Sequence, residues 1–218
     1  MPISAPNPTK AINTWRTLLG SDHIHLDPTT RHTLSTATFN TNTPVSGLLE
    51  PADVTQLQKL VHIAHDHHIP IYPISSGCNW GYGSRVPTTT DAFIVTLHRL
   101  NNILHYDSQL GLVTIEPGVT FHQLQQFLTQ QHGRFTLNHP GSSPHASIIG
   151  NIAERGKIIG PHADRWRSVI GLELLLPNGR FFHTGTPTNQ PVYPHLPGPA
   201  LDALFFQSNL ALITKLTL

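Results

Sequence analysis

Two loops of small residues are the part of the sequence best suited to bind an anionic ligand. The first is Ser75–Ser84, with the sequence SSGCNWGYGS, and the second contains Gly141-Ser142-Ser143. Small residues let backbone N–H groups approach phosphate oxygens closely, and hydroxyls and the Asn79 amide add hydrogen-bond donors. Trp80 and Tyr82 offer flat faces to an aromatic ring. Such loops are also common as structural turns, and both interpretations stay open at this point.

Motifs for other phosphate-binding or catalytic sites are incomplete. Gly81-Tyr82-Gly83 is followed by Val86 where a dinucleotide fingerprint needs a third glycine. The stretch 150–157 superficially resembles a P-loop, but Ile158 replaces the required Ser or Thr. The sequence contains no G-x-S-x-G elbow, so a serine hydrolase has no support.

The histidine-rich segment HIAHDHH, residues 62–68, is a candidate metal site. On a helix, His62 and His65 share a face and could hold a metal ion. They lie opposite the apolar stripe of that helix, and neither a cysteine partner nor an H-E-x-x-H motif accompanies them. The pattern therefore favours a solvated polar face; a histidine-rich metal-binding protein is a weaker alternative.

The composition excludes several classes of protein. Charged residues make up 11% of the 218 residues, against the ~25% usual for soluble domains. The formal net charge is +1, so there is no basic excess to bind nucleic acid. No apolar run is long enough for a membrane span, and the N-terminus does not resemble a signal peptide. The single cysteine, Cys78, allows no internal disulfide, so we expect a cytoplasmic protein.

Hydrophobic periodicity predicts alternating helices and strands around these loops. Asn178-Gly179 predicts a type I′ hairpin turn, and the Thr- and Pro-rich stretch 27–51 predicts an extended linker. We expect helices at 8–19, from near Pro51–Asp53 to before Pro70, at 120–131 and at 200–208, and strands at 69–74, 93–97, 103–106, 112–115, 169–176, 180–184 and 210–217.

Ordered blocks of sequence resemble one family of flavoproteins. The blocks are PIYPISSGCNWGYGS, IEPGVTFHQL, GSSPHASIIGNIAERG, GLELLLPNGRFFHTG and LFFQSNLALITK. They resemble the FAD-binding domain of the vanillyl-alcohol oxidase / p-cresol methylhydroxylase family from about Trp15 to Leu218. The resemblance implies an α+β fold of two subdomains with FAD held between them. It divides the chain into an N-terminal helix and linker (1–44), subdomain 1 (45–105) and subdomain 2 (106–218), incomplete at its C-terminus.

The resemblance also implies which residues bind the cofactor. The glycine-rich loop after the first strand would wrap the FAD pyrophosphate, and further positions would face the flavin or the adenosine. The implied cofactor-binding residues are Ser75, Ser76, Gly77, Cys78, Asn79, Trp80, Gly81, Tyr82, Gly83, Ser84, Pro117, Gly118, Val119, Gly141, Ser142, Ser147, Gly150, Asn151, Glu173 and Ile213.

The chemistry implied by the resemblance is oxidation of 4-alkylphenols and 4-hydroxybenzyl alcohols. A hydride leaves the benzylic carbon for FAD and gives a quinone methide, because the phenol is held as an electron-donating phenolate. Tyr82 matches a tyrosine that binds the phenolate, and Asp164 matches an acid/base near the flavin. The segment RGKIIGPHADR departs from the family pattern, with His162 where a tyrosine is expected. An ion pair of Asp164 with Arg165 or Arg167 is the alternative.

Two further features of the sequence differ from the family. Cys78 stands where the family tends to carry arginine; we expect an inert thiol, with a covalent flavin link as the alternative. The resemblance also implies that the chain ends before a cap domain that supplies much of the phenol pocket. A truncated gene product, half of a split enzyme completed by a second chain, and a deliberately shortened fragment would each explain this. The alternatives in function are a non-catalytic FAD-binding remnant and an oxidase for another alcohol or hydroxy acid.

Overall fold

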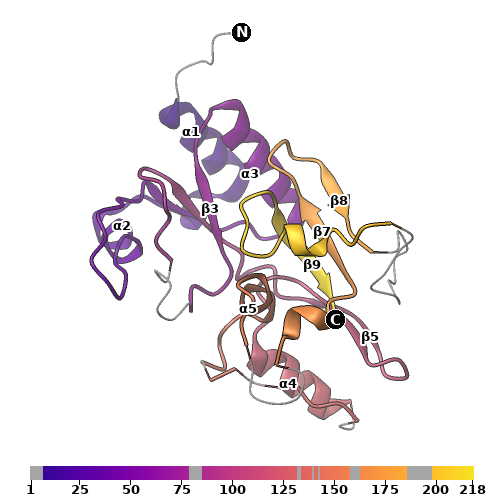
Figure 1. Ribbon diagram of the computed structural model, residues 1–218. Coiled ribbons are helices and arrows are strands. Elements are labelled where there is room, and N and C mark those ends of the chain that lie inside the picture. Colours follow the sequence, from indigo (N-terminus) through magenta and orange to yellow (C-terminus); the bar gives the residue numbers. More distant parts are fainter. Residues whose placement is uncertain are drawn as a thin grey trace. The chain divides into compact units, whose positions relative to one another are not determined.

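Two compact units make up the chain (Figure 1). Unit 1 comprises residues 1–99 with Pro177–Arg180, and unit 2 comprises Leu100–Leu176 with Phe181–Leu218. Each unit combines helices with a sheet, which confirms the predicted α+β fold. The computed structural model describes residues 7–78, 85–131, 134–138, 140–141, 143–157, 163–185 and 198–218.

Unit 1 contains a mixed sheet with the strand order β1-β2-β4-β3. β4 pairs in parallel with both β2 and β3, whereas β1 pairs antiparallel with β2. The described elements of unit 1 are α1 (Pro8–Leu19), the 3₁₀ turn η1 (Ser21–His23), β1 (Ile24–His25), α2 (Pro28–Leu34), β2 (Gly47–Leu49), α3 (Val54–Asp66), β3 (Ile71–Ile74) and β4 (Phe93–Thr96).

The core of unit 1 lies where α1 and α3, side by side in Figure 1, meet β4. Trp15 of α1 is fully buried, and its ring meets the ring edge of Phe93 with 5.0 Å between centroids. The Trp15 indole N–H donates to the carbonyl of Leu60 in α3 over 3.3 Å. Asp53 caps α3 by accepting from the N–H of Gln56. Both helices expected from the apolar spacing are therefore confirmed.

The stretch 27–51 contains regular structure, so the prediction of an extended linker is wrong. Asp27 accepts a hydrogen bond from the N–H of Thr30, and Pro28 occupies the first turn of α2. β2 then follows within the same stretch. The Asp-Pro start signal was present, but the many threonines of α2 gave no apolar periodicity to accompany it.

Unit 2 contains an antiparallel sheet with the strand order β5-β6-β9-β7-β8. Its core gathers fully buried side chains of α4 and α5, among them Phe121, Ile148 and Ile152. The described elements are β5 (Ile103–Asp107), β6 (Leu112–Ile115), α4 (Phe121–Gln130), α5 (Ile148–Ala153), the 3₁₀ turn η2 (Arg165–Ser168), β7 (Gly171–Leu175), β8 (Phe181–His183), the 3₁₀ turn η3 (Asp202–Leu204) and β9 (Leu212–Thr217).

The hairpin between β7 and β8 is confirmed, but its predicted type I′ turn is wrong. Gly179 has a φ of +75°, whereas Asn178 is not among the residues with positive φ. A type I′ turn needs positive φ at both central positions. Instead, the Asn178 side chain accepts from the N–H of Arg180. The loop therefore spans residues 176–180 and is stabilised by an Asx turn.

The helix predicted at 200–208 is also wrong, because the structure has only the short turn η3 in that range. Asp202 is bonded to the hydroxyl of Thr184, and Gln207 adopts a φ of +52° while its N–H donates to Ala153. These tertiary contacts hold the segment in an irregular path. No helix in the described ranges is long and apolar enough to cross a bilayer.

Candidate functional site

In unit 1, the first small-residue loop leaves the carboxyl end of the parallel strand β3. The Thr96 hydroxyl at the end of β4 donates to the carbonyl of Ser75 over 3.2 Å. Gly77 adopts a φ of +67°, which favours glycine. The Arg85 guanidinium lies beside it, with Nε 3.7 Å from the point where a Gly77 Cβ would stand. A cation therefore lies next to a small-residue loop, as an anion site requires.

Cys78 lies half-buried at the end of the described part of this loop. Its thiol makes a weak contact, 3.7 Å, with the carbonyl of Ser76. The inert role and the covalent flavin link both stay predictions. The residues Asn79, Trp80, Gly81, Tyr82, Gly83 and Ser84, predicted from the resemblance, lie outside the described residues, as do Ser142 and His162.

In unit 2, Ser147 brings three of the predicted cofactor residues together. It is 4% exposed, and its hydroxyl donates to the carbonyl of Pro117 over 2.6 Å. The same oxygen accepts from the N–H of Gly150 over 2.9 Å and so caps α5. The N–H of Ile148 donates to the carbonyl of Val119. The turn Pro117-Gly118-Val119 and the start of α5 are thus joined.

A buried carboxylate, that of Glu116, directly precedes that turn. Glu116 accepts from both the backbone N–H and the side-chain amide of Asn102, at 2.9 and 2.8 Å. The N–H of Gly118 donates to the carbonyl of Leu100 over 2.6 Å. The backbone of Pro117–Val119 is therefore fixed by hydrogen bonds within unit 2.

Asn151 of α5 is the next predicted residue, and it is held at both ends of its side chain. Its Oδ1 accepts from Nη1 of Arg165 over 3.2 Å. Its amide packs so closely on Gly156 that a Cβ there would overlap it. Gly141 has open space around its Cα, since a Cβ there would meet nothing within 4 Å.

Asp164, the predicted acid/base, forms an ion pair with Arg167, with 3.3 Å between Oδ2 and Nε. The Asp164 side chain is 33% exposed and that of Arg167 is 70% exposed. The backbone of Asp164 bridges to that of Lys157. The ion pair considered from the sequence thus exists with Arg167, and the catalytic role stays a prediction.

Glu173 and Ile213 lie on neighbouring strands of the unit 2 sheet, β7 and β9. Glu173 accepts from the hydroxyl of Thr214 over 2.9 Å and pairs with Lys215 Nζ over 2.8 Å. Ile213 is buried. The structure therefore gives both residues a place in the sheet, and their proximity to the adenosine stays a prediction.

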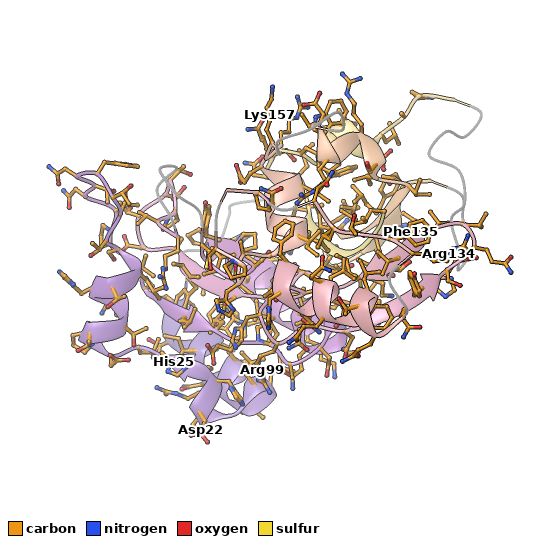
Figure 2. The ribbon with its side chains drawn as sticks, turned by 90° about the horizontal axis from the view of Figure 1, so that it is seen from below. Asp22, His25, Arg99, Arg134, Phe135 and Lys157 are labelled. Carbon is orange, nitrogen blue, oxygen red and sulfur yellow. The ribbon has the colours of Figure 1, made fainter. Side chains whose placement is uncertain are left out.

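The histidines of α3 do not come together with enough partners in the described ranges to form a metal site. His62 and His65 are exposed, and His65 lies 3.6 Å from Asp66. His25, labelled in Figure 2, lies 3.4 Å from the carboxylate of Glu50. Among the described residues, no group of three His, Cys, Asp or Glu side chains could hold a metal ion.

Sequence reasoning missed the roles of two arginines. Arg85 lies beside the Gly77 loop, and Arg165 is buried against α5 rather than paired with Asp164. No pattern in the sequence separates these two arginines from the exposed ones.

The residues present fit the FAD that the resemblance implies. Unit 1 combines a left-handed glycine, hydroxyl-bearing residues and a guanidinium, which suits the negative phosphates of a dinucleotide. Unit 2 supplies a fixed turn, a capped helix and a buried guanidinium from Arg165.

Comparison with known proteins agrees with this fit. The family model described as FAD binding domain matches residues 45–185. The chain is 40% identical over 214 residues to 1'-carboxy-chondrochloren decarboxylase of Chondromyces crocatus, covering 96% of this chain and 40% of that protein. It is 29% identical to the 4-cresol dehydrogenase [hydroxylating] flavoprotein subunit of Pseudomonas putida, covering 95% of this chain and 41% of that protein.

Solved structures show the same fold. The structure of p-cresol methylhydroxylase with substrate bound superposes with a TM-score of 0.89 at 28% identity, covering 98% of this chain and 44% of that one. 4-Ethylphenol oxidase from Gulosibacter chungangensis gives 0.90 at 25% identity, covering 99% and 44%. The chain spans about two fifths of the length of these relatives. The chain therefore belongs to the FAD-binding domain family, has the fold of the p-cresol methylhydroxylase type, and takes FAD as its cofactor.

Proposed function

We propose that this chain is the FAD-binding portion of a flavin-dependent oxidoreductase that oxidises 4-alkylphenols or 4-hydroxybenzyl alcohols. The observation that carries the proposal is the agreement, over 95% or more of this chain, with two proteins named for the oxidation of 4-alkylphenols. Bound FAD supplies the acceptor for the hydride that leaves the benzylic carbon. The protein binds and orients the reactants and moves the protons.

Different residues of this chain carry out these tasks in unit 1 and in unit 2. The Ser75–Cys78 loop with Arg85 binds the negative charge of the cofactor in unit 1. In unit 2, Ser147 fixes the backbone at Pro117, and the side chain of Asn151 is held by Arg165. Asp164 is two-thirds buried, so its carboxylate can take up a proton and still exchange it with water. Its pair with Arg167 limits the directions that the carboxylate can adopt.

The test compares this chain alone with a longer one. We expect the purified chain to bind FAD but to show negligible turnover of 4-ethylphenol or vanillyl alcohol, because about three fifths of each relative lies outside the matched part. A chimera that joins this chain to the remaining segments of 4-ethylphenol oxidase should be reduced anaerobically by 4-ethylphenol.

Two controls make the chimera informative. Benzyl alcohol, which lacks the 4-hydroxyl group, should not reduce it, and Asp164→Asn should slow reduction by 4-ethylphenol while FAD stays bound. A chimera that binds FAD and is reduced by no 4-substituted phenol would contradict the proposal and favour a non-catalytic FAD-binding remnant.

A second candidate function is removal of CO2 from a carboxylated substrate, which the 40% identity to a decarboxylase favours. 4-Hydroxymandelate separates the two candidates, because it carries both a benzylic C–H bond and a carboxylate. Loss of hydride alone yields the keto acid and releases no CO2. Oxidative decarboxylation transfers the same two electrons, yields 4-hydroxybenzaldehyde and releases one CO2 per turnover.

The cytoplasmic location expected from the composition is also a proposal.

A further inference from the structure

Arg165 stands out in unit 2 as a buried cation with uncharged partners. Its side chain is 5% exposed, although it begins the short turn η2. Nη1 donates to the side-chain oxygen of Asn151, and Nη2 donates to the backbone carbonyl of Asn138. The guanidinium also stacks on the ring of Phe121, 4.5 Å from its centroid.

These partners belong to separate segments of the predicted cofactor site. Asn151 is itself one of the predicted cofactor residues, and Asn138 lies three positions before Gly141. Phe121 starts α4, and Asp164 is the neighbour of Arg165 in sequence. One guanidinium thus joins α4, α5 and the segment 134–138 to the residue predicted to act as acid/base. Its planar fork of donors allows it to hold two acceptors in a fixed relation.

The charge of this guanidinium is not neutralised within the described part of the chain. Asp164 pairs with Arg167 instead, and no described carboxylate lies within 4 Å of Arg165. Burial lowers the pKa of Arg165 to about 10, so the side chain still carries its charge at neutral pH. A buried charge without a counter-charge is unfavourable, and a bound anion would relieve that cost.

We propose that Arg165 is a positioning residue for FAD: it fixes Asn151 and the segment leading to Gly141 in one arrangement, and the negative charge of the cofactor offsets its own. The inference rests on FAD binding by this chain. It gives a role to a residue that is not among the cofactor-binding residues implied by the resemblance. Removing Arg165 should therefore weaken FAD binding and change the orientation of the bound flavin. Both effects should exceed what any loss of folded protein would explain.

The test uses the full chain and three variants. Arg165→Gln removes the charge and the fork, whereas Arg165→Lys keeps the charge but cannot span both acceptors. Arg134→Gln is the matched control, because Arg134 is an exposed arginine of the same unit (Figure 2). The dissociation constant is measured by flavin fluorescence, the flavin orientation by visible circular dichroism, and the folded fraction by thermal melting without FAD.

We expect Arg165→Gln to raise the Kd for FAD by ~10- to 100-fold, the range of a lost charge-assisted hydrogen bond. Its visible dichroism should change as well. The Kd of Arg165→Lys should lie between those of wild type and Arg165→Gln. The Kd and the dichroism of Arg134→Gln should equal those of wild type. An Arg165→Gln protein with wild-type Kd and dichroism would overturn the proposal. So would a loss of affinity no larger than the loss of folded protein, since that describes a purely structural residue.

If Arg165→Gln does not fold, Arg165→Lys decides. A wild-type Kd and wild-type dichroism in that variant would overturn the proposal, and an intermediate Kd with altered dichroism would support it. Failure of the unsubstituted chain to bind FAD would instead overturn the cofactor assignment, and that is seen before any variant is compared.

Discussion

The two units hold their predicted cofactor residues by different means. In unit 1 the described residues are consecutive, Ser75–Cys78, and their arrangement depends on the backbone conformation at Gly77. In unit 2 they are scattered from Pro117 to Ile213, and those between Pro117 and Asn151 are joined by buried side chains, chiefly Ser147 and Arg165. A site built from backbone conformation leaves small residues in the sequence, whereas a site built from side-chain links can be recognised only in the fold.

The largest expected effect comes from breaking the link at Ser147. Ser147→Ala leaves the buried Pro117 carbonyl and the N–H of Gly150 without the partner seen here. We expect a loss of about 2–3 kcal/mol in the free energy of unfolding, measured with urea, and weaker FAD binding. Ser143→Ala is the matched control for stability, because the Ser143 hydroxyl accepts from the N–H of the exposed residue His145. Equal losses in the two variants would contradict the link.

The next prediction concerns the pH dependence that Arg165 confers on unit 2. Its pKa is lowered to about 10 by burial, so the unfolded chain binds a proton more tightly than the folded one. Between about pH 10 and the ordinary arginine pKa, wild type should therefore gain stability relative to Arg165→Met, by about 1.4 kcal/mol per pH unit at most. Below about pH 9 the difference should be constant. Urea unfolding at a series of pH values measures it, and a flat difference throughout would show that the guanidinium is not desolvated.

A smaller effect is expected from the backbone-held loop of unit 1. Gly77→Ala has room for its Cβ, since the nearest atom lies 3.5 Å away, but it must adopt a φ of +67°. We expect a loss of about 1 kcal/mol in stability and a matching drop in FAD affinity. Gly77→Asn should lose less, because asparagine tolerates this conformation. Equal Kd values for wild type and Gly77→Ala would show that the loop conformation does not matter for binding.

The smallest effect on stability is expected at Asp164. Its partner Arg167 is largely exposed, so Asp164→Asn should change the free energy of unfolding by less than about 0.5 kcal/mol. The same variant should slow flavin reduction in the chimera with 4-ethylphenol oxidase. A large loss of stability with unchanged reduction would reverse the assignment and make Asp164 a structural residue.

The sequence predicted most of the scaffold because apolar spacing marks helices that pack on a core. α1, α3 and α4 are predicted this way, and so are β3 and β4 of unit 1 and the strands of unit 2, whereas the short strands β1 and β2 are missed. α2 was missed because its threonines hide any apolar stripe, although Asp27 and Pro28 signalled its start. The helix predicted near the C-terminus does not form, because Asp202 and Gln207 make contacts with residues distant in sequence. No local pattern in the sequence reveals these contacts.

The predicted site likewise has a part that local sequence marks and a part that only folding brings together. Glycines and serines indicate the unit 1 loop from the sequence alone, because their small size is the property that the loop requires. The burial of Arg165 and its contacts with Asn138 and Asn151 depend on segments brought together by folding. Arg165 and Arg167 are alike in type and close in sequence, yet one is buried and the other is 70% exposed. From the sequence alone, both arginines are equally suitable ion-pair partners of Asp164.

FAD binding by this chain is tested most directly by the flavin content of the purified protein. The chain is incubated with FAD, separated from free cofactor by gel filtration and denatured to release what remains bound. We expect one FAD per chain and a visible flavin absorption spectrum before denaturation. A folded, colourless protein that retains no FAD after this treatment would contradict the account.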